Sequence, residues 1–232
     1  MPRPLSPQSL PPLTRADLAT APTRLLRDGR WANAQVFRVE AAGIAWVVKD
    51  FSRRRFWVRN TIGRVLLGRE LRALRRLDGI DGVPQRPFRI DRHAIAAGFI
   101  PGVTLGQVPA EQLDTQFFTD LERLMSAVHE RGVVHLDTRG TGNMLRRPDG
   151  KPALIDFQAW LDTRWMPASW RQWFCDLDMA GVYKKWMQRD PETMGDARRE
   201  LYERMTRWRK LWIARGYAGA TKQKPSVPTG PS

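Results

Sequence analysis

Side chains that carry oxygen ligands recur at close intervals in the middle of the sequence. The stretch 135–158, HLDTRGTGNMLRRPDGKPALIDFQ, contains Asp137, Asn143 and, after a short apolar run, Asp156. A carboxylate can orient an attacking hydroxyl group, and carboxylate and amide oxygens can hold Mg²⁺ on nucleotide phosphates. A loop with Asp137 and Asn143, followed by a hairpin that returns Asp156, supplies both. The segment therefore predicts phosphoryl transfer; the alternative is a turn composed of ordinary turn-forming residues.

A lysine near the end of a predicted strand requires an anionic partner. Lys49 lies in the apolar strand predicted over 44–51, where a buried cation is costly unless it is paired. Glu70 is the only acidic residue of the helix predicted over 60–77, and it shares an apolar face with Leu74. We predict that Glu70 pairs with Lys49. The alternative is a surface glutamate paired with a neighbouring arginine.

Hydrophobic periodicity predicts the elements that position these residues. Strands are expected at 23–27, 35–40, 44–51, 88–91 and 94–100, and helices at 60–77, 114–131 and 196–215. We predict an α+β fold with a disordered Pro-rich N-terminus (1–16), a small β-rich lobe (17–100), a mainly helical lobe (101–215) and a disordered tail (216–232). Pro101-Gly102 would form the hinge between the lobes.

The composition favours anionic partners. The formal net charge is +15, which attracts nucleotides, nucleic acid or anionic lipid headgroups. Nine arginines lie between Phe51 and Leu77: Arg53, Arg54, Arg55, Arg59, Arg64, Arg69, Arg72, Arg75 and Arg76. Phe56 and Trp57 stand among them, a mixture that suits a lipid interface or nucleic acid. The alternative is a solvated basic helix. The region after residue 158 is rich in tryptophan, with Trp160, Trp165, Trp170, Trp173 and Trp186.

Cysteine usage and hydropathy narrow the class of protein. Cys175 is the only cysteine, which excludes an internal disulfide and a cysteine-based zinc site and fits a reducing compartment. We find no signal-peptide pattern and no apolar run of 18 residues. These features predict a cytoplasmic protein.

The order His-x-Asp…Asn…Asp-Phe resembles the catalytic loop and the metal-binding motif of the protein-kinase-like superfamily. The resemblance covers about residues 22–190 and implies a two-lobed fold, kinase activity, and ATP and Mg²⁺ as cofactors. It implies that Lys49 holds phosphates and pairs with Glu70, that Asp137 orients the acceptor hydroxyl, and that Asn143 and Asp156 hold Mg²⁺. It also implies that Arg139 contacts the γ-phosphate, that His135 braces the loop, and that Asp176 or Asp178 braces it from a helix.

The sequence departs from the superfamily pattern at four places. Six positions rather than five separate Asp137 from Asn143, so the loop has one extra residue. No G-x-G-x-x-G precedes Lys49, and Gly29 is the only glycine available for the nucleotide-binding loop. Gln158 replaces the glycine of Asp-Phe-Gly, and no Ala-Pro-Glu follows.

With these departures, the sequence resembles the small bacterial kinase-like proteins. Among these, the basic and aromatic residues favour the lipopolysaccharide core kinases, which act on Kdo or heptose, and the RIO-type kinases come second. The first resemblance implies an anionic glycolipid or sugar acceptor and peripheral contact with the acidic inner membrane. The second implies a Ser/Thr protein kinase with nucleic-acid contacts. A third alternative is a binding protein with a kinase fold and no catalytic activity.

Overall fold

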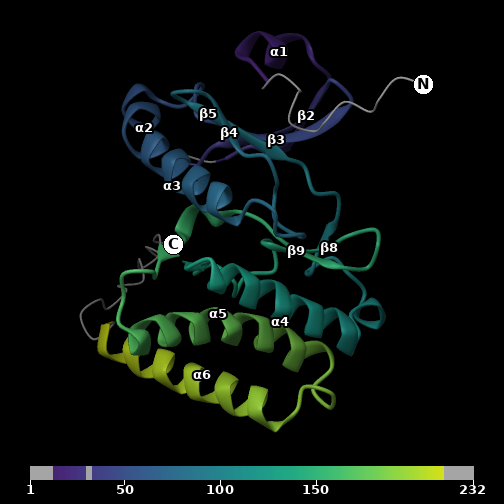
Figure 1. The fold of residues 1–232 in the computed structure, drawn as a ribbon, viewed down its shortest axis with the longest axis vertical. Helices are drawn as coiled ribbons and strands as arrows, with labels where there is room; N and C mark the ends of the chain where they lie inside the picture. Colours follow the sequence, from purple (N-terminus) through teal and green to yellow (C-terminus); the bar gives the residue numbers. More distant parts are fainter. Residues whose placement is uncertain (1–12, 30–32, 217–232) are drawn as a thin grey trace, which may run out of the picture.

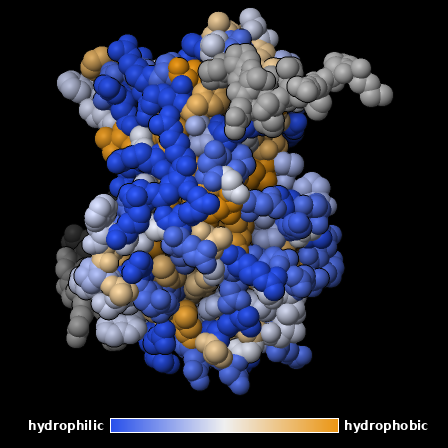
Figure 2. Space-filling model, viewed as in Figure 1, coloured by the Kyte–Doolittle hydropathy of each residue, from blue (hydrophilic) through white to orange (hydrophobic). Residues whose placement is uncertain are grey.

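Two lobes, an upper one built on a β-sheet and a lower one built from helices, stack along the long axis of the molecule (Figure 1). The structure is a computed structural model that describes residues 13–29 and 33–216. The predicted α+β class is confirmed. A space-filling view in the same orientation shows a mostly hydrophilic upper lobe, with hydrophobic residues visible in the groove between the lobes (Figure 2).

The upper lobe contains one antiparallel five-stranded sheet in the order β1-β2-β3-β5-β4. Its strands are β1 (Thr23–Arg27), β2 (Gln35–Ala41), β3 (Ile44–Asp50), β4 (Phe88–Asp91) and β5 (Ala94–Gly98). The register places Lys49 of the central strand β3 between Val36 of β2 and Ile95 of β5. Because β3 is hydrogen-bonded to a strand on each side, its backbone is held in place. The Lys49 side chain therefore projects from a rigid part of the sheet.

Helices cover both faces of this sheet. The helices of the upper lobe are α1 (Arg15–Thr20), α2 (Phe56–Asn60) and α3 (Ile62–Leu77). Leu67 and Leu71 of α3 pack with Phe51 and Ile95 against one face, and α1 covers the other face near Trp46. The helix predicted from residue 60 is broken at Thr61, where the backbone angles are not helical.

The boundary predicted for the disordered N-terminus, residue 16, was placed too late in the chain. Residues 1–12 lie outside the described residues, but residues 13–16 are ordered: Leu13 is buried and α1 begins at Arg15. The side chain of Thr14 accepts a hydrogen bond from the Asp17 amide, and the Asp17 carboxylate accepts one from the Thr14 amide. This reciprocal capping box starts the helix and is visible in the sequence TRAD. In the predicted tail, Gly216 ends α6, and residues 217–232 lie outside the described part.

The lower lobe is mainly helical, with two small sheets near the cleft. Its elements are β6 (Val103–Thr104), the 3₁₀ turn η1 (Ala110–Gln112), α4 (Thr115–Glu130), β7 (Val133–Val134), β8 (Met144–Arg146), β9 (Pro152–Leu154), the 3₁₀ turn η2 (Phe157–Ala159), β10 (Leu161–Asp162), α5 (Ala168–Arg189) and α6 (Asp196–Gly216). One sheet has the order β6-β8-β9, and β7 pairs with β10. Among the helices that the structure describes, none is long and apolar enough to cross a membrane.

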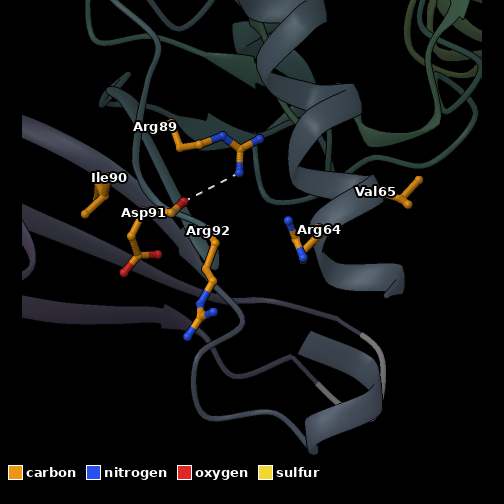
Figure 3. Close-up of a pocket in the computed structure, with 6 residues that line it drawn as sticks. All are labelled: Arg64, Val65, Arg89, Ile90, Asp91 and Arg92. Carbon is orange, nitrogen blue, oxygen red and sulfur yellow. Dashed lines mark hydrogen bonds between the residues drawn. The ribbon is translucent and has the colours of Figure 1, made fainter. Parts of the chain in front are cut away.

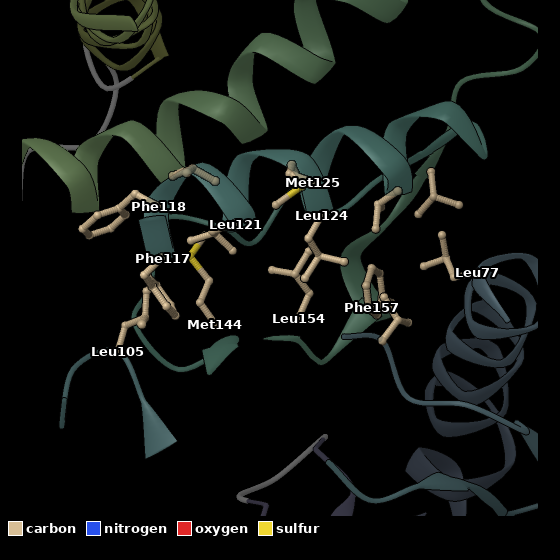
Figure 4. Close-up of a cluster of buried hydrophobic side chains, with 14 of the residues drawn as sticks. Leu77, Leu105, Phe117, Phe118, Leu121, Leu124, Met125, Met144, Leu154 and Phe157 are labelled. Atoms are coloured by element: carbon tan, nitrogen blue, oxygen red, sulfur yellow. The ribbon is translucent and has the colours of Figure 1, made fainter. Parts of the chain in front are cut away.

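A single hydrophobic core joins the two lobes. It contains Leu74 and Leu77 of α3 together with buried residues of α4, α5 and the β8–β9 hairpin, and Figure 4 shows Leu77 and Phe157 at one end of the α4 side chains. Phe157, directly after Asp156, is fully buried in this core. The core therefore fixes α3, which carries Glu70, relative to the segment that carries Asp156.

Candidate active site

A continuous cleft separates the lobes and has an apolar end and a polar end. The apolar end has a volume of about 360 Å³ and includes Val36 and Val47 from the upper sheet and Leu145 and Ile155 from the lower lobe. The polar end includes Asp137, Gly140 and Gln158. Lys49, Asn143 and Asp156 line both ends. The cleft therefore combines a flat apolar slot with charged groups, as a nucleotide site requires.

Lys49 joins two carboxylates from different parts of the chain. Its Nζ lies 2.7 Å from Glu70 Oε1 on α3 and 2.6 Å from Asp156 Oδ1. The exposed fractions of these side chains are 12% for Lys49, 4% for Glu70 and 22% for Asp156. The predicted pairing of Lys49 with Glu70 is present in the structure, and the alternative of a surface glutamate is excluded because Glu70 is buried.

Burial and charge act in opposite directions on these three groups. Burial disfavours the charge of Lys49, but the two neighbouring carboxylates outweigh burial and raise the pKa of Lys49. Burial also raises the pKa of Glu70, with a further contribution from Asp156. Burial opposes the charge of Asp156 as well, but attraction to Lys49 outweighs burial and lowers the pKa of Asp156. At neutral pH, Lys49 is therefore a cation and Asp156 an anion.

Asp137 and Asn143 lie together at the polar end despite the extra residue between them. Asn143 Nδ2 donates hydrogen bonds to Asp137 Oδ2 at 2.7 Å and to the Asp137 carbonyl oxygen at 3.1 Å. Gly140 and Gly142 have open space where a Cβ atom would stand. The loop therefore accommodates its insertion outwards, and the contact between Asp137 and Asn143 is retained. Asp137 itself is exposed, so a substrate can reach it.

The catalytic loop is fixed from below by Asp178 of α5. The buried Asp178 carboxylate accepts hydrogen bonds from the backbone amides of His135 at 2.5 Å and Leu136 at 2.8 Å. It also lies 3.2 Å from His129 Nε2. The sequence analysis named Asp176 and Asp178 as alternative residues for bracing the loop. The structure places Asp178 under the loop, whereas Asp176 accepts hydrogen bonds from Gln172 and Arg204.

His135 braces the loop from inside. Its Nδ1 accepts a hydrogen bond from the Asp137 amide at 3.3 Å, and its Nε2 lies 2.9 Å from the Ile155 carbonyl oxygen. These two contacts require a neutral ring with the proton on Nε2. The ring also packs on Phe157, with the centroids 4.6 Å apart. The bracing role predicted for His135 therefore has a structural basis.

Two non-glycine residues of the site have left-handed backbone conformations. Leu136 has φ 64°, and Asp156 has φ 66°. A branched residue such as Leu136 is uncommon in this region, and its strain must be offset by surrounding contacts. Asp178 supplies such contacts to Leu136, and Lys49 holds the side chain of Asp156. The strain coincides with the two turns that aim Asp137 and Asp156 into the cleft.

Arg69 and Trp160 connect α3 to the segment that follows Asp156. Trp160 Nε1 donates a hydrogen bond to the Arg69 carbonyl oxygen at 2.8 Å. The Arg69 side chain donates to the carbonyl oxygens of Gln158 and Trp160. Arg76, two turns later on α3, lies over the Trp160 ring at 4.9 Å and pairs with Asp162 at 2.9 Å. No local sequence pattern predicts this contact, because it joins residues about 90 positions apart.

Two predicted site residues do not line the cleft. Gly29 is buried in the β1–β2 turn, where an added Cβ would lie 2.2 Å from the Ala34 carbonyl oxygen; its need for glycine is therefore explained by the turn itself. Arg139 is half-buried, and its carbonyl oxygen accepts a hydrogen bond from Lys185 Nζ at 2.6 Å. Arg139 is not among the residues that line either end of the cleft.

Arg27 lines the cleft and was missed in the sequence. It ends β1, and its Nη1 lies 3.8 Å from Asp156 Oδ2. Its side chain is 63% exposed, so it can move towards an anion in the cleft. The sequence signal that could have identified Arg27 is its position as a basic residue at the end of β1, directly before the β1–β2 turn.

The oxygen donors of the cleft fit a magnesium ion that is shared with phosphates. Among the residues that the structure describes, no three His, Cys, Asp or Glu side chains form a metal-binding group. The cleft offers the carboxylate of Asp156 and the amide oxygen of Asn143, whose nitrogen already bonds to Asp137. Mg²⁺ is commonly bound by one or two protein oxygens, with phosphate and water completing its six ligands. The donor set therefore fits Mg²⁺ on a nucleotide rather than a metal held by protein alone.

A protein-family model, described as "RIO domain", matches residues 47–194. The chain belongs to the RIO-domain family. Among solved structures, the chain is similar to the Rio2 kinase of Chaetomium thermophilum in a complex with ADP/Mg²⁺ and phosphoaspartate. That match has a TM-score of 0.54 and 16% identity, and covers 82% of this chain and 70% of the other. A second Rio2 kinase structure from the same organism has a TM-score of 0.53 and 15% identity, with coverages of 80% and 72%.

These comparisons confirm the kinase-like fold and the prediction of a kinase. They support the RIO branch, which was the second of the two resemblances, rather than the lipopolysaccharide kinases that the sequence analysis placed first. Among curated proteins, none matches the chain. The matched region 47–194 contains Lys49, Glu70, Asp137, Asn143 and Asp156.

Proposed function

We propose that the protein is a RIO-type kinase that uses ATP and Mg²⁺ to phosphorylate a hydroxyl group. One observation carries the proposal: the Lys49–Glu70–Asp156 cluster and the Asp137–Asn143 pair line one cleft, although they come from both lobes. Phosphoryl transfer depends mainly on positioning and electrostatic stabilisation. A cation, a metal ligand and a hydroxyl acceptor in one cleft are the groups that this chemistry requires.

The two ends of the cleft suit the two ends of ATP. The apolar slot between Val36 and Val47 above and Leu145 and Ile155 below can sandwich a purine ring. The phosphates then extend towards Lys49, which meets the oxygens of the α- and β-phosphates, and Arg27 supplies a second cation. Asp156 and Asn143 would hold Mg²⁺, which neutralises charge that develops on the transferring phosphoryl group.

Asp137 is suited to the acceptor side of the reaction. It is exposed at the polar end of the cleft, and its Oδ2 is held by the amide of Asn143. A carboxylate in this position accepts a hydrogen bond from the attacking hydroxyl and aims its oxygen at the γ-phosphate. Asn143 would therefore have two roles, because its nitrogen orients Asp137 while its oxygen remains available to hold Mg²⁺.

The acceptor that we favour is a protein hydroxyl, because the RIO family match supports a RIO-like kinase. A sugar hydroxyl of an anionic glycolipid is the second candidate, and exposed arginine and tryptophan side chains on the surface favour it. The Rio2 complex with phosphoaspartate suggests a further outcome, in which a carboxylate of the chain itself receives the phosphoryl group from ATP and ADP is released.

The test is a transfer assay with γ-labelled ATP and Mg²⁺, offered a generic protein, a deacylated lipopolysaccharide core, or no acceptor. Label in protein supports the favoured acceptor, label in the sugar fraction supports the second, and hydroxylamine-sensitive label on the chain indicates an acyl phosphate. Asp137→Asn should reduce transfer by about 10²–10⁴-fold while ATP binding persists. The matched control Asp149→Asn changes an exposed carboxylate outside the cleft and should have no effect. Binding of Mg-ATP without transfer to any of these acceptors would show a binding protein and overturn the proposal.

A further inference from the structure

The short helix α2 presents two aromatic side chains to solvent. Phe56 and Trp57 are 60% and 75% exposed, and their rings meet edge to face with centroids 5.7 Å apart. No residue of α2 is buried. Large apolar side chains gathered on a surface indicate a site that a partner covers.

The apolar surface continues onto the first turn of α3. Ile62 and Val65 are 50% and 60% exposed, so two branched aliphatic side chains follow the two aromatic ones in sequence, on a helix that contacts α2. The function proposed above uses none of these residues. None of them lines the nucleotide cleft.

Arginines surround these apolar side chains. Arg53 and Arg55 precede α2 and are exposed. Arg64 of α3 and Arg89 and Arg92 of the β4–β5 hairpin border one hollow, and Figure 3 shows their guanidinium groups spread around it. Among the residues that the structure describes, these five arginines form no ion pair with a carboxylate. Asp50 and Asp91 both pair with Arg15, which leaves one net negative charge against the five arginines, so the surface stays positive.

The structure divides the nine arginines of the 51–77 stretch into separate groups. Arg54 pairs with Asp28 and Arg59 donates to the Ser52 carbonyl oxygen. Arg69 and Arg76 face the lower lobe. The nine arginines therefore do not form one continuous basic face. The basic surface is shorter and lies at α2, the start of α3 and the β4–β5 hairpin.

We propose that this surface docks on an anionic lipid bilayer. The α2 surface, as we call it, consists of Arg53, Arg55, Phe56, Trp57, Ile62, Arg64, Val65, Arg89 and Arg92. Aromatic and aliphatic side chains enter the boundary between headgroups and acyl chains, while the arginines meet lipid phosphates. The combination favours lipid over nucleic acid, because Ile62 and Val65 gain free energy by leaving water but cannot stack on bases as rings do.

A second group of exposed tryptophans lies in the lower lobe. Trp165 precedes α5, and Trp170 and Trp173 lie in its first two turns; they are 87%, 63% and 42% exposed, and Trp208 of α6 is 59% exposed. In Figure 1, α2 and the N-terminal end of α5 are both at the left. Because tryptophan prefers the membrane–water interface, we include Trp165 and Trp170 in the proposed contact with the bilayer.

Vesicle co-sedimentation tests the proposal with the full chain. Vesicles of phosphatidylcholine alone are compared with vesicles that contain 30% phosphatidylglycerol by design. Binding is expected only with the acidic vesicles and should weaken as salt rises, because screening acts within about 8–10 Å at physiological ionic strength. Arg53→Ser with Arg55→Ser should lower the partition coefficient about 25-fold, since each basic residue near an acidic surface contributes about fivefold. The matched control, Arg123→Ser with Lys151→Ser, removes the same charge elsewhere and should lower it much less.

The apolar side chains need their own variants. Trp57→Ser should weaken binding and leave its salt dependence unchanged, whereas Trp57→Phe should restore most of the binding. Trp165→Ser with Trp170→Ser tests the second contact in the same way. Equal losses for the two charge-removing pairs would show general attraction only and would overturn the docking surface. Salt-sensitive binding to RNA with no binding to acidic vesicles would also overturn it, in favour of a nucleic-acid partner.

Discussion

The ion pair beneath the catalytic loop makes the stability of the protein depend on pH. His129 is 9% exposed, with its Nε2 3.2 Å from the carboxylate of Asp178. Burial disfavours the protonated ring, but the hydrogen bond and charge of Asp178, together with those of Cys175, outweigh burial and raise the pKa of His129 from 6.5 to about 9. The same carboxylate holds the backbone amides of His135 and Leu136. Protonation of His129 is therefore coupled to the order of the catalytic loop.

The size of this pH-dependent stabilisation follows from the change in the pKa of His129 between the unfolded and folded states. One pKa unit is worth about 1.4 kcal/mol, so a pKa of about 9 instead of 6.5 corresponds to about 3 kcal/mol of stabilisation. Because folding raises the pKa, this stabilisation is fully present below pH 6.5 and is lost as the pH rises through about 9. About 2–3 kcal/mol of the free energy of unfolding should therefore disappear between pH 7 and pH 10.

Urea denaturation of the wild type and of His129→Gln over this range measures the effect. Glutamine keeps a donor for Asp178 but cannot titrate, so the difference in unfolding free energy between the two proteins should narrow by about 2–3 kcal/mol as the pH rises from 7 to 10. His93→Gln is the control, because burial and neighbouring arginines lower the pKa of His93 and keep it neutral throughout. A difference between wild type and His129→Gln that stays constant with pH would refute the reasoning.

Three further predictions concern the cleft. Asp156→Asn should weaken Mg-ATP binding and turnover together, and Asn143→Ala should be comparably severe because the structure retains its contact with Asp137. Calorimetric titration measures Mg-ATP binding and the transfer assay measures turnover; near-wild-type values of both in Asn143→Ala would contradict this prediction. Lys49→Met should abolish transfer without unfolding, and Glu70→Gln should give a milder defect, because Glu70 positions Lys49; a silent Glu70→Gln beside an inactive Lys49→Met would show that the pairing is dispensable. Trp160→Phe should cost about 1 kcal/mol of stability through the lost hydrogen bond to α3 and should lower kcat more than it raises the KM for ATP, whereas unchanged kinetics would limit Trp160 to a structural role.

The parts of the site that sequence alone could predict are those with local patterns. The loop with Asp137, the hairpin that returns Asp156, and the apolar faces of α3 and α4 are each encoded within about 25 residues. Glu70 could be paired with Lys49 because a lone carboxylate on an apolar face needs a buried partner. The capping box at Thr14 was also visible, but the Pro-rich composition around it favoured disorder and concealed it.

The parts that could not be predicted depend on long-range geometry. Arg27 reaches Asp156 across 129 positions of the chain, and no local pattern specifies that approach. Choosing Asp178 over Asp176 required the phase of α5 relative to the catalytic loop. The choice between lipopolysaccharide kinases and RIO-type kinases was based on surface charge. Surface charge bears on solubility and association rather than on the chemistry of the acceptor.

The segment after Asp156 explains how the cleft is assembled without the usual activation-segment ending. Phe157 is buried in the core shared with Leu74 of α3, and Trp160 binds the backbone of α3 beside Glu70. Any movement of α3 that withdraws Glu70 from Lys49 must therefore also break the Trp160 contact and open the core. Within the described part of the chain, Glu70 Oε2 is buried and has no hydrogen-bond partner. Attraction to Lys49 and a smaller contribution from Gln158 favour the charge of Glu70, so the Lys49 pairing is the main compensation for its burial. Lys49, Asp156 and α3 therefore form one packed unit, which explains why the cleft keeps its arrangement without that ending.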